Sequence, residues 1–400
     1  MKKMVYIALF LLLLGSQAMA ASFFSSTNNS LGLRTYMTTV RGMGMGNTGL
    51  ASLDPFSVNP YNTSTWLGIN ETRVSILMKY NVNQIDFGWQ TVLTHTANFS
   101  GLQLAIPLQR HKWVFGFGLT PYTMVNFSYT QKIDTDSRTL NEYIYNKGNI
   151  SRAQFSLSYS PEKRVGLGFN FYYFFGTIND DYNLSFDDNE FYDAFYELEY
   201  RFHGPSVGFN AFLNPVDSLT LGGFLDLKPR LRFSVVYRSQ LTEAQEKYST
   251  HSTIPVQWGV GASYTMAKQW TISADYSFQQ WSEGFEITDE KLKFLEDWFN
   301  VGLGVEHSHA PRKSKSIFQK IDLRAGVSYT QIGYQFNQNS VKEYGIHAGV
   351  GIPFAHRTGR VDVAFVVGRR GEGTSTVAQE TFFRTLISVS AGELWFQKLR

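Results

Sequence analysis

A glycine-rich stretch, RGMGMGNTGL at positions 41–50, is the first candidate for a functional site in the sequence. Its glycines could wrap a phosphate group with backbone N–H groups, as nucleotide-binding loops do. Such a loop needs a preceding strand, a following helix and usually a Lys next to Ser or Thr, and no Lys follows Gly49. Glycine also allows one backbone to lie directly against another, because it has no side chain. We therefore favour close backbone packing over phosphate binding.

The other candidates for chemistry are histidines and carboxylates. The eight histidines are scattered, and no G-x-S-x-G motif accompanies them. His307 and His309 could share a metal ion, but no third ligand is evident. The acidic residues at 180–190 could bind Ca²⁺, although they lack the spacing of an EF-hand. With no cysteine in the chain, we predict no enzyme activity, no catalytic residue, no metal and no cofactor.

The first twenty residues predict export. Lys2 and Lys3 precede an apolar run at 5–14, and Ala18-Met19-Ala20 matches a small-x-small cleavage site. The run is too short to span a bilayer as a helix. We expect a signal peptide at 1–20 and a mature chain from about Ala21. Export and a net charge of only +3 give no reason to expect a nucleic-acid partner.

Much of the remaining chain alternates between apolar and polar or small residues. The clearest segments are 153–160, 256–264, 270–278 and 321–329. A period of two is the strand period. Several alternating segments are far longer than the five or six residues of an average strand. Long strands with one apolar face suit a transmembrane barrel, with lipid outside and a polar lumen inside, and a sheet in lipid must close on itself.

Turn signals divide the alternating region into strands. Short connections at 109–112, 161–164, 214–218 and 266–269 alternate with longer ones, as in barrels with short turns on the periplasmic side. Splitting the first strand near 81–83 would give fifteen strands, and an odd number would put the chain ends on opposite sides of the membrane. We therefore predict an all-β, antiparallel transmembrane barrel of about fourteen strands over residues 72–400. Residues 21–71 do not alternate and are too short for their own core, so we expect them to form a small plug, or hatch, inside the lumen.

Two stretches resemble the FadL-type outer-membrane transport proteins, which take up long-chain fatty acids and aromatic hydrocarbons. The first is similar to the N-terminal hatch motif of that family, through Gly42, Gly44, Gly46, Gly49, Asn59 and Pro60. The second, at 254–282, is similar to a strand pair of the family, through Pro255, Gly261, Tyr264, Trp270, Asp275, Tyr276, Trp281 and Ser282. The resemblance implies a fourteen-stranded barrel with an N-terminal hatch. It also implies a hydrophobic substrate that is released when the hatch shifts.

The resemblance assigns hatch and gating roles to Gly42, Gly44, Gly46, Gly49, Asn59 and Pro60. For ligand binding we expect an apolar pocket beside the hatch, formed partly by Met43, Met45, Leu50 and Phe56. The loop at 289–300 is predicted to hold a short amphipathic helix, serving as a ligand landing site or as a lid, with Leu292, Leu295 and Trp298 on its apolar face.

Alternation also places several polar and aromatic side chains. We expect inward charges to pair with each other and with the plug, because unpaired interior charges are costly. These charges are Arg232, Asp275, Asp322 and Arg324. Tryptophans at 258, 270, 281 and 395 are expected at the membrane interfaces.

These patterns favour passive uptake of hydrophobic small molecules, such as long-chain fatty acids, across the outer membrane of a Gram-negative-type bacterium. Expected partners are the hydrophobic ligand, membrane lipid and the barrel-assembly machinery, which could read Phe396 near the C-terminus. The alternative is a FadL-like barrel that serves as a shuttle or carrier component of a protein secretion system. An apolar pocket beside the hatch would favour uptake, and a protein-sized outer surface would favour secretion. A general porin is disfavoured, because residues 21–71 would block its channel.

Overall fold

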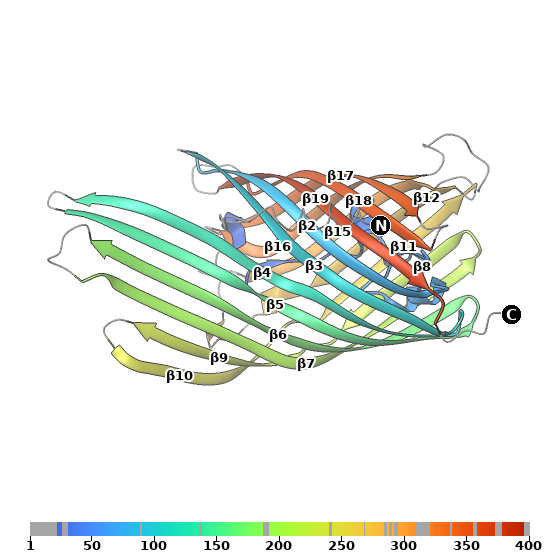
Figure 1. Ribbon diagram of the computed structural model, residues 1–400, viewed down its shortest axis with the longest axis horizontal. Helices are drawn as coiled ribbons and strands as arrows, with labels where there is room; N and C mark the ends of the chain where they lie inside the picture. The colour runs from blue at the N-terminus through green and yellow to red at the C-terminus, as the bar shows by residue number, and fades with distance from the viewer. Residues whose placement is uncertain are drawn as a thin grey trace.

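A computed structural model of the chain shows the alternating segments closed into an antiparallel barrel (Figure 1). The structure describes residues 22–25, 31–88, 90–135, 138–186, 192–239, 242–267, 269–283, 286–287, 290–291, 295–308, 321–336, 338–354, 358–372 and 378–395. Among these residues, no helix is both long and apolar enough to cross a bilayer.

The wall is built from strands that pair with their neighbours in chain order. They are β2 (Thr72–Asp86), β3 (Thr91–Gln109), β4 (Trp113–Thr135), β5 (Arg138–Glu162), β6 (Val165–Phe186), β7 (Ala194–Val216), β8 (Leu219–Asp226), β9 (Arg230–Ser239), β10 (Thr242–Thr253), β11 (Gln257–Met266), β12 (Trp270–Gln279), β15 (Leu295–His307), β16 (Asp322–Phe336), β17 (Asn339–Phe354), β18 (Gly359–Arg370) and β19 (Gln379–Glu393). β8 with β9, and β10 with β11, each make one interrupted wall strand, so the described residues confirm the prediction of fourteen. β19 pairs with β2 from Gln379↔Asp86 to Glu393↔Thr72 and closes the barrel.

The two faces of the wall follow the alternation of the sequence. On β6, Leu167, Phe169 and Phe171 are exposed on the outside, while Gly168 and Asn170 are buried on the inside. Exposed apolar side chains recur at every second position on most of the other strands. Such a surface suits contact with lipid, and the paired ladder satisfies the backbone hydrogen bonds that lipid cannot.

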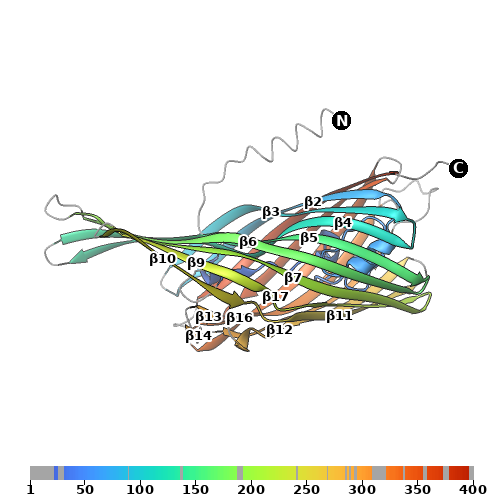
Figure 2. The ribbon, with the colours of Figure 1, turned by 90° about the horizontal axis from the view of Figure 1, so that it is seen from below.

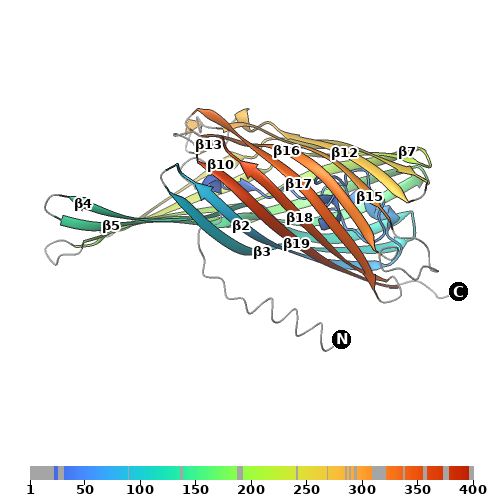
Figure 3. The same cartoon turned by 90° about the horizontal axis from the view of Figure 1, so that it is seen from above.

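One side of the barrel is much longer than the other. β4, β5, β6 and β7 contain 23, 25, 22 and 23 residues, whereas β15 to β19 contain 12 to 16. The long strands, with β9 and β10, run past the rest of the barrel as a projecting sheet (Figures 1 and 2). Figure 3 shows the shorter side, formed by β16 to β19 with β2 and β3. We call the opposite end, where residues 110–112, 163–164 and 217–218 join strands, the short-turn end.

Two neighbouring wall strands are interrupted at the same height. β8 stops at Asp226 and β9 starts at Arg230, while β10 stops at Thr253 and β11 starts at Gln257. Residues 229 and 255 are prolines, which have no N–H to donate to a ladder. The two prolines explain why neither wall strand is continuous here. The projecting sheet begins near this interruption.

The first described residues, 22–25 and 31–71, form an N-terminal segment that lies inside the barrel (Figure 1). It contains η1 (Phe23–Ser25), β1 (Leu33–Arg34), α2 (Val40–Met43) and η3 (Thr63–Gly68). β1 pairs with β4 through Leu33↔Met124. Thr39 caps α2 by accepting a hydrogen bond from the Gly42 N–H. The location in the lumen is the one expected for a plug.

Three expectations about individual segments are wrong. Residues 295–300 belong to strand β15 rather than to a helix, and Leu292 lies outside the described residues. The elements described just before them are η4 (Trp281–Glu283), β13 (Glu286–Ile287) and β14 (Glu290–Lys291). Trp281 is 1% exposed and packs in the interior, not at an interface, because the chain has turned inward from β12. Arg232 is exposed, because its neighbours Leu231 and Phe233 take the inward positions of β9.

Candidate functional site

The glycine-rich stretch lies directly against the backbone of the wall. Gly46 has φ +73°, and a Cβ added to it would stand 2.4 Å from the Val327 carbonyl oxygen and 2.6 Å from that of Leu303. A Cβ added to Gly44 would stand 2.9 Å from the Cα of Gly349. These distances leave no room for any side chain. They agree with the close-packing interpretation.

The wall also carries glycine where it meets this stretch. Cβ atoms added to Gly302, Gly304 and Gly326 would each come within 2.5 Å of the backbone of Met45 or Gly46. Glycines on both surfaces therefore let two backbones touch, which any larger residue would prevent.

The rest of the predicted gating motif organises the turn after the glycines. Asn59 donates from Nδ2 to the Gly49 carbonyl oxygen at 2.9 Å, and its Oδ1 accepts the Tyr61 N–H at 2.9 Å. Trp66 donates from Nε1 to the Asn59 carbonyl oxygen at 2.8 Å. Pro60, also buried, sits between these contacts. Gly49, Asn59 and Pro60 thus hold the shape of the N-terminal segment.

Asp275 fastens this turn to the wall. Its Oδ2 accepts the backbone N–H groups of Gly49 at 2.6 Å and of Leu50 at 2.8 Å. Asp275 is buried on β12 and forms no ion pair with a described residue. Inward charges were expected to pair with each other and with the plug, and Asp275 binds the plug through backbone donors rather than through a charge.

Asp275→Ala should destabilise the folded barrel. The change leaves two buried N–H groups without an acceptor, and each such loss costs about 1–3 kcal/mol. Asp275→Asn keeps an acceptor oxygen and should cost less. The free energy of unfolding in urea, measured on barrels folded into lipid vesicles, checks this order. Equal losses for Ala and Asn would show that the negative charge, not the hydrogen bonds, is what matters.

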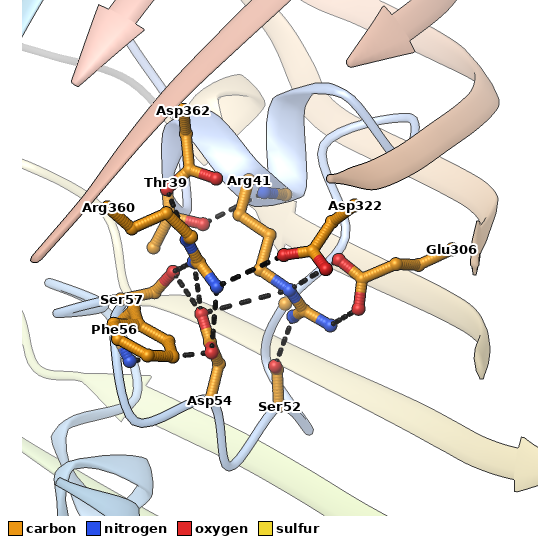
Figure 4. Close-up of polar contacts among 12 residues, drawn as sticks. Thr39, Arg41, Ser52, Asp54, Phe56, Ser57, Glu306, Asp322, Arg360 and Asp362 are labelled. Carbon is orange, nitrogen blue, oxygen red and sulfur yellow. Dashed lines mark hydrogen bonds and ion pairs between the residues drawn. The ribbon is translucent and has the colours of Figure 1, made fainter. Parts of the chain in front are cut away.

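A buried ionic cluster joins the N-terminal segment to the short-turn end (Figure 4). It consists of Arg41, Asp54, Glu306, Asp322, Arg324, Arg360 and Asp362. Arg41 meets Glu306 at 2.6 Å, and Arg324 meets the same carboxylate at 2.6 Å and Asp362 at 2.7 Å. The Arg324 side chain has no exposed surface. The expected pairing of Arg324 and Asp322 is present at 3.3 Å.

Asp54 is the carboxylate that the N-terminal segment contributes to this cluster. Arg360 donates to it from Nη1 at 3.1 Å, and Ser57 donates its hydroxyl at 2.6 Å. Burial opposes ionisation of Asp54, but Arg360 and Arg41 outweigh it and hold its pKa well below the ordinary value. A carboxyl group with a lowered pKa stabilises the fold above its unfolded pKa of about 3.9, and loses that effect only as the pH falls further. Asp54 therefore stays ionised at neutral and mildly acidic pH.

Most members of the ionic cluster were not predicted from the sequence. Arg41, Asp54, Glu306, Arg360 and Asp362 were not singled out. The alternation could have indicated that Glu306, Arg360 and Asp362 point inward near strand ends, as they do in the structure. Nothing in the sequence indicates which of them meets Arg41.

The residues predicted to bind a ligand do not share a pocket. Met45 and Leu50 are 1% and 0% exposed and pack against wall glycines. The Phe56 ring lies between the guanidiniums of Arg73 and Arg360, at 5.0 and 4.9 Å. Met43 lines the cavity described below, as does Trp298, whereas Leu295 packs on apolar neighbours at the barrel mouth.

A small cavity with a mixed polar and apolar lining lies in the described part of the lumen. Its volume is about 140 Å³, below the roughly 300 Å³ at which pockets for drug-sized ligands begin. Most of its lining residues are Asn, Ser, Thr and charged residues from the N-terminal segment and from β2 to β4 and β15 to β19. We call it the lumenal cavity. It is not the apolar pocket expected beside the hatch.

A row of aromatic rings crosses the lumen beside this cavity. Trp298 on β15 contacts Tyr36 with ring centroids 5.1 Å apart, Tyr36 contacts Tyr61 at 4.5 Å, and Tyr61 contacts Phe224 on β8 at 5.3 Å. These rings belong to a buried cluster that includes Trp281 and Phe233. The N-terminal segment is thus packed against both sides of the wall.

The possible metal sites gain no support from the structure. Within the described residues, no three His, Asp or Glu side chains gather as a metal site requires. His307 packs on Trp270, and His309 and residues 187–190 lie outside the described residues.

Comparisons with known proteins agree with the barrel fold. The structure resembles a FadL homologue from Pseudomonas aeruginosa with a TM-score of 0.64 and 14% identity, over 90% of this chain and 99% of that one. It resembles the toluene transporter TbuX of Ralstonia pickettii with a TM-score of 0.60 and 15% identity, over 91% and 100%. It resembles the toluene transporter TodX of Pseudomonas putida with a TM-score of 0.60 and 15% identity, over 90% of this chain and 99% of that one. These relatives are transporters rather than enzymes, and at such identity the likeness shows a shared fold.

A search of curated protein sequences found no match. One protein-family model, named BamG, matches residues 1–219 and 230–400. Because that model covers nearly the whole sequence, the chain belongs to the BamG family.

Proposed function

We propose that this protein is a closed outer-membrane barrel that binds protein partners, as an accessory of the machinery that assembles or exports other outer-membrane proteins. The proposal rests on one arrangement: the N-terminal segment occupies the lumen, and a sheet of long strands projects beyond the barrel. The BamG family name points to the same barrel-assembly context. The proposal follows the alternative hypothesis from the sequence, in which a FadL-like barrel serves as a shuttle or carrier component of a protein secretion system.

The contacts of the N-terminal segment support a closed barrel. Opening the lumen would separate Arg41 from Glu306 and Gly49 from Asp275, and would pull Gly46 out of its backbone contact. Breaking one buried ion pair alone costs about 3–5 kcal/mol. The small cavity in the described lumen can bury little of a hydrophobic ligand, so a ligand there has little binding energy with which to drive this change.

The projecting sheet supports a partner surface. It carries exposed aromatic side chains beyond the lipid-facing part of the wall, at Tyr143, Tyr192, Phe195 and Tyr196. Tyr192 is 91% exposed. Tyr and Phe are enriched where proteins bind proteins. The sheet is several strands wide, which is large enough for a protein rather than a small molecule (Figure 2).

Passive uptake of hydrophobic molecules is the second candidate. One observation favours it: the fold covers almost the full length of structures described as toluene transporters. The interruption of β8/β9 beside β10/β11 would provide a place for sideways release. Fatty acids and aromatic hydrocarbons are the substrate classes that this reading implies.

Site-specific photo-cross-linking in living cells separates the two functions. A photoreactive residue at Tyr196 should cross-link to the central barrel-assembly subunit, identified by antibody. The matched control is Phe169, an exposed aromatic on the lipid-facing part of β6. A deletion strain should lose outer-membrane proteins but take up labelled toluene and oleate normally. Uptake lost with normal outer-membrane protein levels, and no cross-link from Tyr196, would reverse the proposal in favour of transport.

A further inference from the structure

The lumenal cavity has an excess of positive charge. Four cationic side chains line it, and one carboxylate, Glu343, lines it with them. The cations are Arg34, Lys79, Arg370 and Arg384. A second carboxylate, Glu380, lies behind Arg370 at 3.0 Å. Even with Glu380 included, positive charges outnumber negative ones by two.

Two of the cations already use both carboxylates. Arg370 donates to Glu343 from Nε at 2.8 Å and to Glu380 from Nη1 at 3.0 Å. Arg384 donates to both oxygens of Glu343 at 2.7 and 2.9 Å. Glu380 also accepts the Ser22 hydroxyl at 2.8 Å. Both carboxylates are therefore already engaged by Arg370, and Glu343 by Arg384 as well.

The other two cations have no carboxylate partner in the part of the chain that the structure describes. Arg34 lies 3.6 Å over the Tyr122 ring and donates to the Tyr122 carbonyl oxygen and to Gln257, which are neutral. Its Nε is buried without a hydrogen bond. Lys79 makes neither an ion pair nor a hydrogen bond with a described residue, and it points inward from β2 between Leu77 and Asn81.

The rest of the lining is uncharged and combines polar with apolar side chains. His347 accepts the Ser328 hydroxyl at Nε2, 2.7 Å away, and donates from Nδ1 to the Met43 carbonyl oxygen at 2.6 Å, so it is satisfied as a neutral ring. Asn98 and Ser100 add further polar groups. A buried charge without a counter-charge is costly, and an anion from solution would relieve that cost.

We propose that the lumenal cavity is a binding site for a compact polar anion with a carboxylate or phosphate group, held chiefly by Lys79. A volume of about 140 Å³ is too small for the tail of a long-chain fatty acid. The anion would lie between β2 and the N-terminal segment, and would link the two. The site does not depend on the proposed function, because it requires only the barrel and its N-terminal segment.

Thermal unfolding of the purified full-length barrel in detergent, followed by its gel-mobility shift, tests the site. Inorganic phosphate and succinate at millimolar concentration should raise the unfolding temperature, while a matched concentration of chloride should not. Lys79→Gln should weaken the apparent affinity by about tenfold or more, as expected for losing a charged hydrogen bond. Lys163→Gln, which removes an exposed charge from a turn, is the control and should respond as the wild type does.

Lys79→Arg keeps the charge and should retain the response, which guards against a Gln variant that folds poorly. Three results would overturn the assignment: no stabilisation by either anion, an unchanged response in Lys79→Gln, or displacement of phosphate by oleate. Stabilisation only by anionic lipid headgroups, without an effect of free phosphate, would contradict a site inside the lumen.

Discussion

Arg324→Ala should lower the free energy of unfolding by about 3–5 kcal/mol, the usual cost of removing one partner from a buried ion pair. Arg324 lies at the centre of the ionic cluster, donating to Glu306 and Asp362 at 2.6 and 2.7 Å. Without it, Arg41 and Arg360 would face four buried carboxylates, and the excess negative charge would have no solvent to screen it. Urea unfolding of barrels folded into lipid vesicles measures the loss.

Arg164→Ala is the matched control. It removes the same charge from an ion pair with Asp217 at 3.3 Å, but both side chains are mostly exposed. Exposed pairs are worth about 0–1 kcal/mol, so this variant should unfold almost as the wild type does. If the two variants lost the same stability, burial of the ionic cluster would not be the source of its effect.

Gly46→Ala should displace the N-terminal segment from the lumen. Any residue other than glycine is strained at φ +73°, and the new Cβ would overlap carbonyl oxygens of two wall strands, β15 and β16. Those strands are fixed by their ladder to each other, so neither oxygen can move away alone. The segment should become sensitive to added protease, and single barrels in planar bilayers should conduct ions.

Gly88→Ala is the control that separates backbone strain at positive φ from steric overlap of the new Cβ. Gly88 has φ +86°, similar to Gly46, but a Cβ there would have no neighbour within 4 Å. This variant should remain closed and resistant to protease. Conductance equal to that of the wild type in both variants would mean that close backbone contact does not keep the lumen closed.

The sequence alone determined the barrel, because lipid on one side and a lumen on the other impose a period of two on every strand. The alternation at 321–329 and 270–278 predicted β16 and β12 for this reason. The spacing of glycines between 42 and 49 predicted close packing, since no other residue allows backbones to touch. Sequence periodicity misled for Arg232 on β9 and for the segment before β15. Leu292, Leu295 and Trp298 fit a helix by spacing, yet residues 295–300 pair with β16.

Only the tertiary structure decided which inward charges meet. Arg41 and Glu306 are 265 residues apart, and their contact depends on the register of every strand between them and on closure of the barrel. The same holds for Asp275, which alternation placed inside correctly but which binds N–H groups of Gly49 and Leu50 instead of a cation. Periodicity says that a side chain points into the lumen. What it meets there is set by how the N-terminal segment folds back, because that segment has no periodic pattern of its own.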